Sequence, residues 1–333
     1  MGRPPPCHGR WLPGYGCVHT NTSVWKNLRR FQNESFAVEQ ATLPTPPTRW
    51  TNSSELAQWL FHHFNTLVPS ASRFAVAIES DYYVPLALLG DSIFEGIRGT
   101  RIGLRHHHYK ALPNATLLGL REWHNQSFLP PYVGATSGSA TQHLLWQLNN
   151  THAPLLPASL RNQPRLVIAL LIGTNNLGLG QPAEEAAAGV LTIAHWLLSQ
   201  TSCRMLIVCG LLPAAPRRGR APMGAPGSHD AWSRVINSTN AKILRGMPTL
   251  SLSGSTDWRD GGSVIGSGSN ARTSCASRRA CFVDCGSAFR TAMGVNLSLM
   301  TDGMHPNEAG MQILGECIGS AIISSEGGAV GVR

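Results

Sequence analysis

The chain has 333 residues, of which 42% are hydrophobic and 14% are charged. This length can bury one sizeable core, so we expect one main domain with an extension. The net charge is +9, but the basic residues are scattered through loops and the sequence contains no recognisable nucleic-acid-binding module, so we expect no nucleic-acid partner. No apolar stretch reaches the roughly 18 residues that cross a bilayer, so we expect no membrane span.

The cysteines and histidines favour disulfides over a metal site. There are eight cysteines, an even number, and no CxxC pair occurs. Three adjacent histidines at 106–108 would point in different directions, which favours a surface loop there. The expected disulfides join sequence neighbours: Cys7 with Cys17, Cys203 with Cys209, and a pair among Cys275, Cys281 and Cys285.

Glycosylation sequons are more frequent than chance predicts. With this Ser and Thr content, chance gives roughly two or three N-x-[ST] triplets. Eight occur, beginning at Asn21, Asn33, Asn52, Asn114, Asn125, Asn149, Asn237 and Asn296. The excess, with the paired cysteines, predicts a secreted protein or one of the secretory-pathway lumen. The start of the chain, MGRPPPCHGRW, has no apolar signal-peptide core, so we expect a leader that lies upstream or has been removed.

Residues 1–82 are expected to form an irregular N-terminal extension. They are rich in proline, as in TLPTPPTRW at 42–50, and contain one short helical pattern from Ser54 to Leu67. Residues 83–326 have a different pattern, which predicts the main domain.

Within 83–326, continuous apolar runs alternate with helical patterns. The runs predict strands at 84–89, 166–172 and 205–212, with a last strand at 281–284. The predicted helices cover 141–148, 183–198, 230–244 and 307–322. Strands without alternation, separated by amphipathic helices, predict a parallel sheet covered on both faces.

Two stretches interrupt this pattern. Residues 213–228 are rich in Pro, Gly and Arg, and a Gly/Ser-rich insertion covers about 249–280. Loops that leave the carboxyl ends of parallel strands border the ligand crevice. The insertion therefore either shapes substrate access or is disordered.

The segment LLGDSIFEG places Ser92 between an apolar strand and a helix. Two interpretations are open. Ser92 can cap the helix, or it can be a nucleophile displayed among free backbone N–H groups at the positive end of the helix dipole. Taken alone, G-D-S favours the cap.

The segment TDGMHPNEAG places Asp302 three residues before His305. This spacing lets the carboxylate bind one imidazole nitrogen while the other faces a serine. The alternative is an ordinary helix start, with Asp302 as cap and Pro306 in the first turn.

Two further strand-to-loop junctions carry candidate residues. GTNN places Asn175 at the end of the run 166–172, where its amide can stabilise an oxyanion, although an Asn-rich turn is also common. In SGSATQHLLWQL, Gly138 lets a backbone N–H approach a ligand just before a helix.

Together these four segments resemble the GDSL or SGNH hydrolase family, whose four blocks carry Ser, Gly, Asn and His. The resemblance covers about residues 85–325, through GDSI at 90–93, Gly138, GTNN at 173–176 and DGMHP at 302–306. Within the family, TQHLLWQL, IGTNN and GLLP are most similar to the catalytic subunits of intracellular platelet-activating-factor acetylhydrolase. The third block usually ends in Asp, whereas position 176 is Asn, as in those subunits.

The resemblance implies a fold and a set of roles. The fold is an α/β protein of the flavodoxin-like three-layer α/β/α sandwich type with a central parallel sheet. Ser92 would be the nucleophile, His305 the base, and Asp302 the group that orients His305. The backbone N–H groups of Ser92 and Gly138 and the side chain of Asn175 would form the oxyanion hole. The implied chemistry needs no cofactor and no metal.

The sequence therefore predicts a serine esterase that removes a small acyl group, with acetyl the expected one. The expected alcohol is a carbohydrate or polysaccharide, because sequons and cysteines favour an extracellular protein. A lipid or phospholipid acetyl ester is the alternative, from the acetylhydrolase resemblance. An alternative of another class is an extracellular glycoprotein that binds carbohydrate without catalysis. The oligomeric state is left open.

Overall fold

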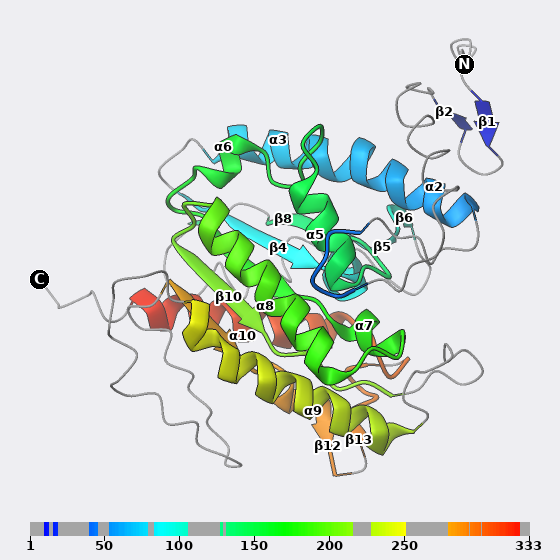
Figure 1. Cartoon of the computed structure of the whole chain (residues 1–333), viewed down its shortest axis with the longest axis vertical. Helices are drawn as coiled ribbons and strands as arrows, with labels where there is room; N and C mark the ends of the chain where they lie inside the picture. The colour runs from blue at the N-terminus through cyan, green and yellow to red at the C-terminus, as the bar shows by residue number, and fades with distance from the viewer. Residues whose placement is uncertain are drawn as a thin grey trace, which may run out of the picture.

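The computed structural model of the chain describes residues 10–12, 16–18, 40–45, 53–78, 83–105, 127–128, 131–215, 228–250, 279–292, 294–300 and 302–326. Its centre is a five-stranded parallel sheet with helices on both faces (Figure 1). The histidines at 106–108, the side chains of Cys7 and Cys17, and most of the insertion at 249–280 lie outside the described residues. So do the sequons at Asn21, Asn33, Asn52, Asn114 and Asn125.

The sheet has a flavodoxin-like strand order, as predicted. In space its strands are β8 (Tyr132–Ala135), β4 (Leu86–Gly90), β9 (Val167–Leu171), β10 (Met205–Cys209) and β11 (Ala280–Val283). In chain order this is 2-1-3-4-5, and every neighbouring pair is parallel. The runs predicted as strands coincide with β4, β9, β10 and β11. No strand is predicted at β8, because YVGA is short and contains glycine.

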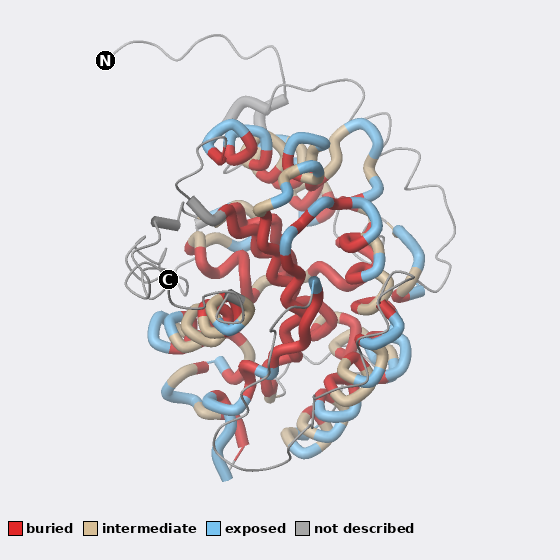
Figure 2. Tube along the Cα trace, turned by 90° about the vertical axis from the view of Figure 1, so that its left-hand side faces the viewer, coloured by how far each residue is buried: buried red, intermediate tan, exposed pale blue. Residues whose placement is uncertain are grey.

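The strands are apolar throughout because both faces of the sheet are buried. Leu86 and Leu88 of β4 point into one hydrophobic cluster, whereas Ala87 and Leu89 point into the other. Figure 2 shows the strands as a buried centre between helices whose outer sides are exposed. At Gly90 the backbones approach so closely that a Cβ would lie 2.2 Å from the carbonyl oxygen of Leu171 on β9. Only glycine fits there.

Helices pack on both faces of the sheet. One face is covered by α3 (Val68–Ala77), α5 (Thr141–Asn149), α6 (Ala158–Arg161), α8 (Ala183–Gln200) and η4 (Met247–Leu250). The opposite face is covered by α4 (Ser92–Glu95), η2 (Gly96–Arg98) and α10 (Glu308–Glu326). Helix α9 (His229–Gly246) packs beside α8 and contributes to both clusters (Figure 1). Among the described residues, no helix is both long and apolar enough to span a membrane.

The segment 53–77 is helical throughout. It comprises α2 (Ser53–His62), the π-helical turn η1 (His63–Leu67) and α3, so the helix continues well beyond the predicted end at Leu67. Leu67, Ala71 and Phe74 join the same hydrophobic cluster as the strand residues of the sheet. This part of the proposed extension therefore packs on the core. The boundary at residue 82 stays a prediction.

The disulfide prediction is wrong for Cys203 with Cys209, whereas the pair among Cys275, Cys281 and Cys285 stays a prediction because Cys275 lies outside the described residues. Cys203 and Cys209 are free and buried; Cys203 lies two residues before β10, and Cys209 is the last residue of β10. Six extended residues span roughly 20 Å, far beyond the reach of a disulfide. Cys285 instead bonds Cys317 of α10, with a Cα–Cα distance of 5.8 Å. Cys281 is also in a disulfide.

The remaining elements are short. They are the strand pairs β1 (Arg10–Leu12) with β2 (Gly16–Val18), β3 (Tyr83–Val84) with β7 (Ser127–Phe128), β5 (Thr100–Arg101) with β6 (Leu104–Arg105), and β12 (Arg290–Thr291) with β13 (Gly294–Val295). The short helices α7 (Thr174–Gly178) and η5 (Ser287–Phe289) complete the set.

Candidate active site

The candidate residues gather at the carboxyl ends of three neighbouring strands. Ser92 follows β4, the loop 136–140 follows β8, and Asn175 lies on α7 after β9. Strand order reverses between β4 and β9, and such a switch point is where open α/β sheets bind ligands. Topology alone therefore brings these segments to one crevice-forming edge.

Ser92 is the first residue of α4, and the cap is its neighbour. Asp91 has an extended backbone, and its Oδ1 accepts a hydrogen bond from the N–H of Ile93 at 3.0 Å. The Ser92 hydroxyl is therefore not needed as a cap. In the first turn of a helix the backbone N–H has no intrahelical acceptor, so the Ser92 N–H lies where a negatively charged group is favoured.

A chain of hydrogen bonds joins Ser92, His305 and Asp302. The His305 Nε2 lies 2.8 Å from the Ser92 Oγ, across 213 positions of sequence. The His305 Nδ1 lies 2.7 Å from the Asp302 Oδ2. In a neutral ring that donates Nδ1–H to the carboxylate, Nε2 is the acceptor for the serine hydroxyl.

The loop around Asp302 holds its carboxylate ionised. The Asp302 Oδ1 accepts the backbone N–H groups of Met304 at 2.9 Å and His305 at 2.7 Å. Burial opposes ionisation, but the hydrogen bond from the His305 ring, its charge and these two N–H groups lower the pKa of Asp302 well below its usual value. The Asp302 side chain therefore holds both the conformation of its loop and the orientation of the His305 ring.

Asn175 contacts the loop that follows β8. Its Nδ2 donates to the carbonyl oxygen of Ser139 at 3.0 Å and lies 3.4 Å from the Asp91 Oδ2. The second contact is longer than an ordinary N–H···O bond. Burial raises the pKa of Asp91 to about 7, against the hydrogen bonds from Ile93, its own backbone N–H and Asn175.

Gly138 sits in a tight turn. The N–H of Ser139 donates to the carbonyl of Thr136 at 3.1 Å, and Gly138 has a φ of +79°. This left-handed conformation is the one that a type II turn requires at its third residue, and it favours glycine. The turn lies next to the Asn175 amide.

The family model of GDSL-like lipases and acylhydrolases matches residues 88–313, more than half of the chain. The chain belongs to the GDSL-like lipase/acylhydrolase family. It is therefore a hydrolase acting on ester bonds, as predicted, and its fold is the one the family resemblance implied.

The solved structures that are similar to the chain have low identity and TM-scores below 0.5. A GDSL-like lipase from Bacteroides thetaiotaomicron has 15% identity and a TM-score of 0.48, over 78% of this chain and 98% of that chain. A mutant acetyl-xylooligosaccharide esterase from Geobacillus stearmophilus has 15% identity and a TM-score of 0.40, over 70% and 91%. A lipase from a goat rumen metagenome has 14% identity and a TM-score of 0.41, over 72% and 97%. No curated protein sequence matches the chain.

In this GDSL-family chain, Asn176 has a structural position distinct from that of Asn175. It is fully buried, and its Oδ1 accepts the N–H of Thr141 at 3.0 Å. Its Nδ2 donates to the Thr141 Oγ1 at 2.8 Å and the Gln181 Oε1 at 2.7 Å. Asn176 therefore ties α7 to the start of α5. Sequence analysis noted this position only as a departure from the usual Asp.

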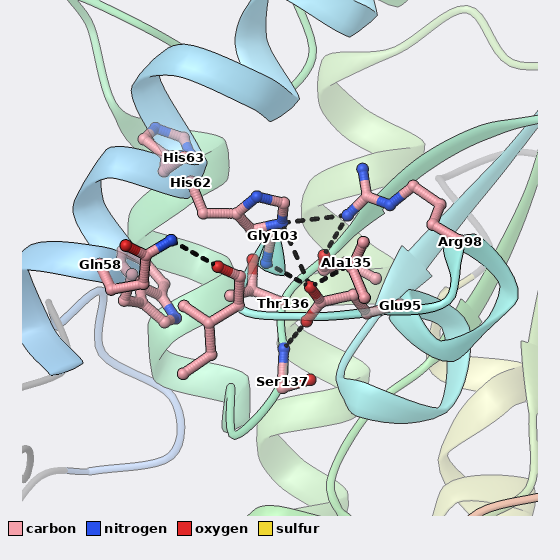
Figure 3. Close-up of polar contacts among 12 residues, drawn as sticks. Gln58, His62, His63, Glu95, Arg98, Gly103, Ala135, Thr136 and Ser137 are labelled. Atoms are coloured by element: carbon pink, nitrogen blue, oxygen red, sulfur yellow. Dashed lines mark hydrogen bonds and ion pairs between the residues drawn. The ribbon is translucent and has the colours of Figure 1, made fainter. Parts of the chain in front are cut away.

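Sequence analysis does not identify a second group of polar residues behind the turn. Glu95, three residues after Ser92, is completely buried and contacts Ser137 (Figure 3). A charged residue within the apolar run IFEGI is a signal that could have identified it. His62 of α2 carries no comparable signal, because its place depends on tertiary packing. No group of three or more potential metal ligands lies together in the part of the chain that the structure describes.

Proposed function

We propose that the protein is a serine esterase that hydrolyses a small acyl ester, with Ser92 as nucleophile, His305 as general base and Asp302 as the group that orients His305. The observation that carries the proposal is the 2.8 Å contact between Ser92 Oγ and His305 Nε2, continued at 2.7 Å to Asp302, in a chain of an ester-hydrolase family. A serine hydroxyl is a poor nucleophile unless such a base accepts its proton.

The reaction would proceed in two halves. As the Ser92 Oγ attacks the ester carbonyl carbon, His305 Nε2 takes its proton, and the carbonyl oxygen becomes an oxyanion. The imidazolium then protonates the departing alcohol as the C–O bond breaks, leaving an acyl-Ser92 ester. In the second half His305 deprotonates a water that attacks this ester, and Ser92 regains its proton as the carboxylic acid leaves.

The oxyanion would be held by the backbone N–H groups of Ser92 and Gly138 and by the side chain of Asn175. Support comes from their positions on the three strand ends that border the switch point. The long contact of Asn175 with Asp91 can be exchanged for a shorter one to the oxyanion. An ionic acceptor forms the stronger hydrogen bond.

We propose that the substrate is an acetylated carbohydrate outside the cell. Eight sequons and the Cys285–Cys317 disulfide support passage through the secretory pathway. Of the described sequon asparagines, Asn149 and Asn237 are exposed. If protein from a eukaryotic secretory host loses no mass on treatment with an N-glycosidase, the secretory part of the proposal fails.

A lipid acetyl ester is the second candidate. The segments TQHLLWQL and GLLP, which resemble those of platelet-activating-factor acetylhydrolase subunits, favour it. The first of these forms α5, next to the turn that carries Gly138. The triad chemistry is the same for either alcohol.

Release of free acetate tests the function and the substrate together. We expect wild type to hydrolyse p-nitrophenyl acetate and to release acetate from acetylated xylan or pectin faster than from acetylated lipids. Ser92→Ala should remove the activity, whereas Ser199→Ala, at an exposed serine of α8, should leave it unchanged. Equal rates in wild type and Ser92→Ala would overturn the assignment of Ser92. No turnover on any ester would favour a binding protein.

A further inference from the structure

Glu95 joins the helix of the nucleophile to the turn that carries Gly138. It ends α4, the short helix that Ser92 begins, and its side chain is completely buried. Its Oε2 accepts the backbone N–H of Ser137 at 2.5 Å. Its Oε1 accepts the backbone N–H of Gly103 at 2.7 Å and the hydroxyl of Thr100 at 3.0 Å. Two oxygens thus bind three donors from two segments.

These contacts require an ionised carboxylate. Burial opposes ionisation, whereas the backbone N–H groups of Gly103 and Ser137 and the positive charge of Arg98 favour it, and the pKa of Glu95 lies below its usual value. The three described groups within 3.0 Å of the carboxylate, the N–H of Ser137, the N–H of Gly103 and the hydroxyl of Thr100, all donate to it. A glutamine at this position would set its own NH₂ against at least one of them, although its size is the same.

Helix α2 lies beside the Glu95 carboxylate, with His62 near both Glu95 and Arg98 (Figure 3). His62 Nε2 lies 3.7 Å from the Glu95 Oε1. Burial lowers the pKa of His62 to about 4, so the ring is neutral at pH 7 and its Nε2 accepts from the Arg98 guanidinium at 3.0 Å. Arg98 also donates to the carbonyl of Ala135, the last residue of β8, at 3.1 Å. The ring packs so closely on Gly103 that a Cβ there would lie 2.4 Å from His62 Nδ1.

The same helix contacts the turn at a second point. Trp59 is fully buried, and its Nε1 donates to the Ser139 Oγ at 3.3 Å. The carbonyl of Ser139 in turn accepts the Asn175 amide. The residues on both sides of Gly138 are therefore held by groups that α2 supports or supplies.

We propose that Glu95 is a positioning residue of this esterase, which fixes the Gly138 turn relative to Ser92 through the N–H of Ser137, with α2 as its support. The inference rests on the proposed function, because it concerns the oxyanion hole. Two of the proposed oxyanion donors, the N–H groups of Ser92 and Gly138, lie on different segments, and Glu95 bonds one segment to the other. Donors that stabilise a transition state must be in place before charge develops.

Glu95→Gln tests the proposal. We expect kcat for p-nitrophenyl acetate to fall about 10- to 100-fold, the range for a displaced or lost oxyanion donor. KM should change less than about twofold, because the ground-state carbonyl depends little on the hole. The affinity for a trifluoromethyl ketone, whose adduct with Ser92 bears an oxyanion, should fall by the same factor as kcat. Glu316→Gln, at a carboxylate of α10 that accepts from Gln312, should change none of these values.

All rates are expressed per active site, counted by titration with a fluorophosphonate. If Glu95→Gln lowers only the number of active sites and each keeps the wild-type kcat and inhibitor affinity, Glu95 is merely structural and the proposal is overturned. Trp59→Phe, which keeps an aromatic side chain but removes the N–H donated to Ser139, decides the matter if Glu95→Gln does not fold. It should lower kcat and inhibitor affinity together by about threefold, as expected for one weak hydrogen bond. If Trp59→Phe keeps the wild-type kcat and inhibitor affinity, the role of α2 in holding the Gly138 turn is overturned.

Failure of the proposed function gives a different result. In that case wild type neither turns over esters nor reacts with the fluorophosphonate, and the positioning role falls with it. If wild type is active, Ser92→Ala is inactive and Glu95→Gln is unchanged, only the positioning role is overturned.

Discussion

Two histidine–carboxylate pairs lie near the candidate active site, and they differ in distance and in exposure. Between His305 and Asp302 the nitrogen–oxygen distance is 2.7 Å, and the Asp302 side chain is 40% exposed. Between His62 and Glu95 it is 3.7 Å, and both side chains are 0% exposed. The first pair lies at the carboxyl edge of the sheet, and the second lies behind the turn that carries Gly138.

The partner of the second ring nitrogen distinguishes the two pairs. The Nε2 of His305 faces the hydroxyl of Ser92, so the ring can take the proton of that hydroxyl. His62 Nδ1 is buried, and it has no hydrogen-bond partner among the residues that the structure describes. A carboxylate beside a histidine therefore does not by itself make a base. The groups around both ring nitrogens decide whether a histidine can act as a base.

Replacing His305 should have the largest effect on activity. His305→Gln should lower kcat by about 10⁴- to 10⁶-fold, because it removes the ring nitrogen that lies 2.8 Å from the Ser92 Oγ and takes its proton. Initial rates of p-nitrophenol release measure this. His195→Gln, at an exposed histidine of α8, is the matched control. A fall of less than about tenfold in His305→Gln would contradict the role of His305.

Asp302→Asn should have the next largest effect. An amide at this position can donate to His305 Nδ1 and so stabilise the tautomer that cannot accept from Ser92, which lowers kcat by about 10³- to 10⁴-fold. The control is Asp230→Asn, because Asp230 also lies beside a histidine, His229, at 3.6 Å on the surface. Equal activity in the two variants would show that Asp302 only caps its loop.

Asn175→Ala should lower kcat about 100-fold, since it removes one proposed oxyanion donor. KM should stay within about twofold of wild type, because the loss falls on the transition state. Asn162→Ala, at the exposed end of α6, serves as control. A change in KM alone would place Asn175 in substrate binding rather than in the oxyanion hole.

The buried His62 should be detected in the pH dependence of stability. Burial keeps the pKa of His62 at about 4, below the usual 6.5, so between these pH values the unfolded chain takes up a proton that the folded chain does not. The free energy of unfolding therefore falls as pH decreases from about 6.5 toward 4, by up to about 1.4 kcal/mol per pH unit for one histidine.

Urea unfolding at several pH values between 7.5 and 4.5 measures this slope. His62→Asn lacks the titrating ring, so its stability should fall less steeply with decreasing pH than that of wild type. Parallel slopes in the two proteins would contradict a neutral, buried His62.

Much of the sheet could be predicted because its strands are buried on both faces. The runs at 84–89, 166–172 and 205–212 contain no polar residue that would hide them; β9 and β10 lie within them, and β4 overlaps the first and ends one residue beyond it. The same reasoning could have prevented the error at Cys203 and Cys209, since the predicted strand at 205–212 already separates these two cysteines.

The two pairs also differ in how far the sequence predicts them. Asp302 and His305 lie on one loop, so their contact follows from local spacing. His62 and Glu95 meet only because α2 packs against the segment after α4, and no local pattern encodes that contact. The helix cap was also only partly predictable from the sequence. G-D-S predicts a helix start, but only the structure shows that Asp91 and not Ser92 is the cap.

The most direct test of the central claim is to trap the acyl-enzyme. Wild type is mixed with p-nitrophenyl acetate, quenched in acid within one turnover, digested and mapped by mass spectrometry. The account predicts an acetyl group on the peptide that contains Ser92, and none on that peptide in His305→Gln over the same time. Acetate release without acetylation of Ser92, or acetylation at another residue that persists in Ser92→Ala, would contradict it.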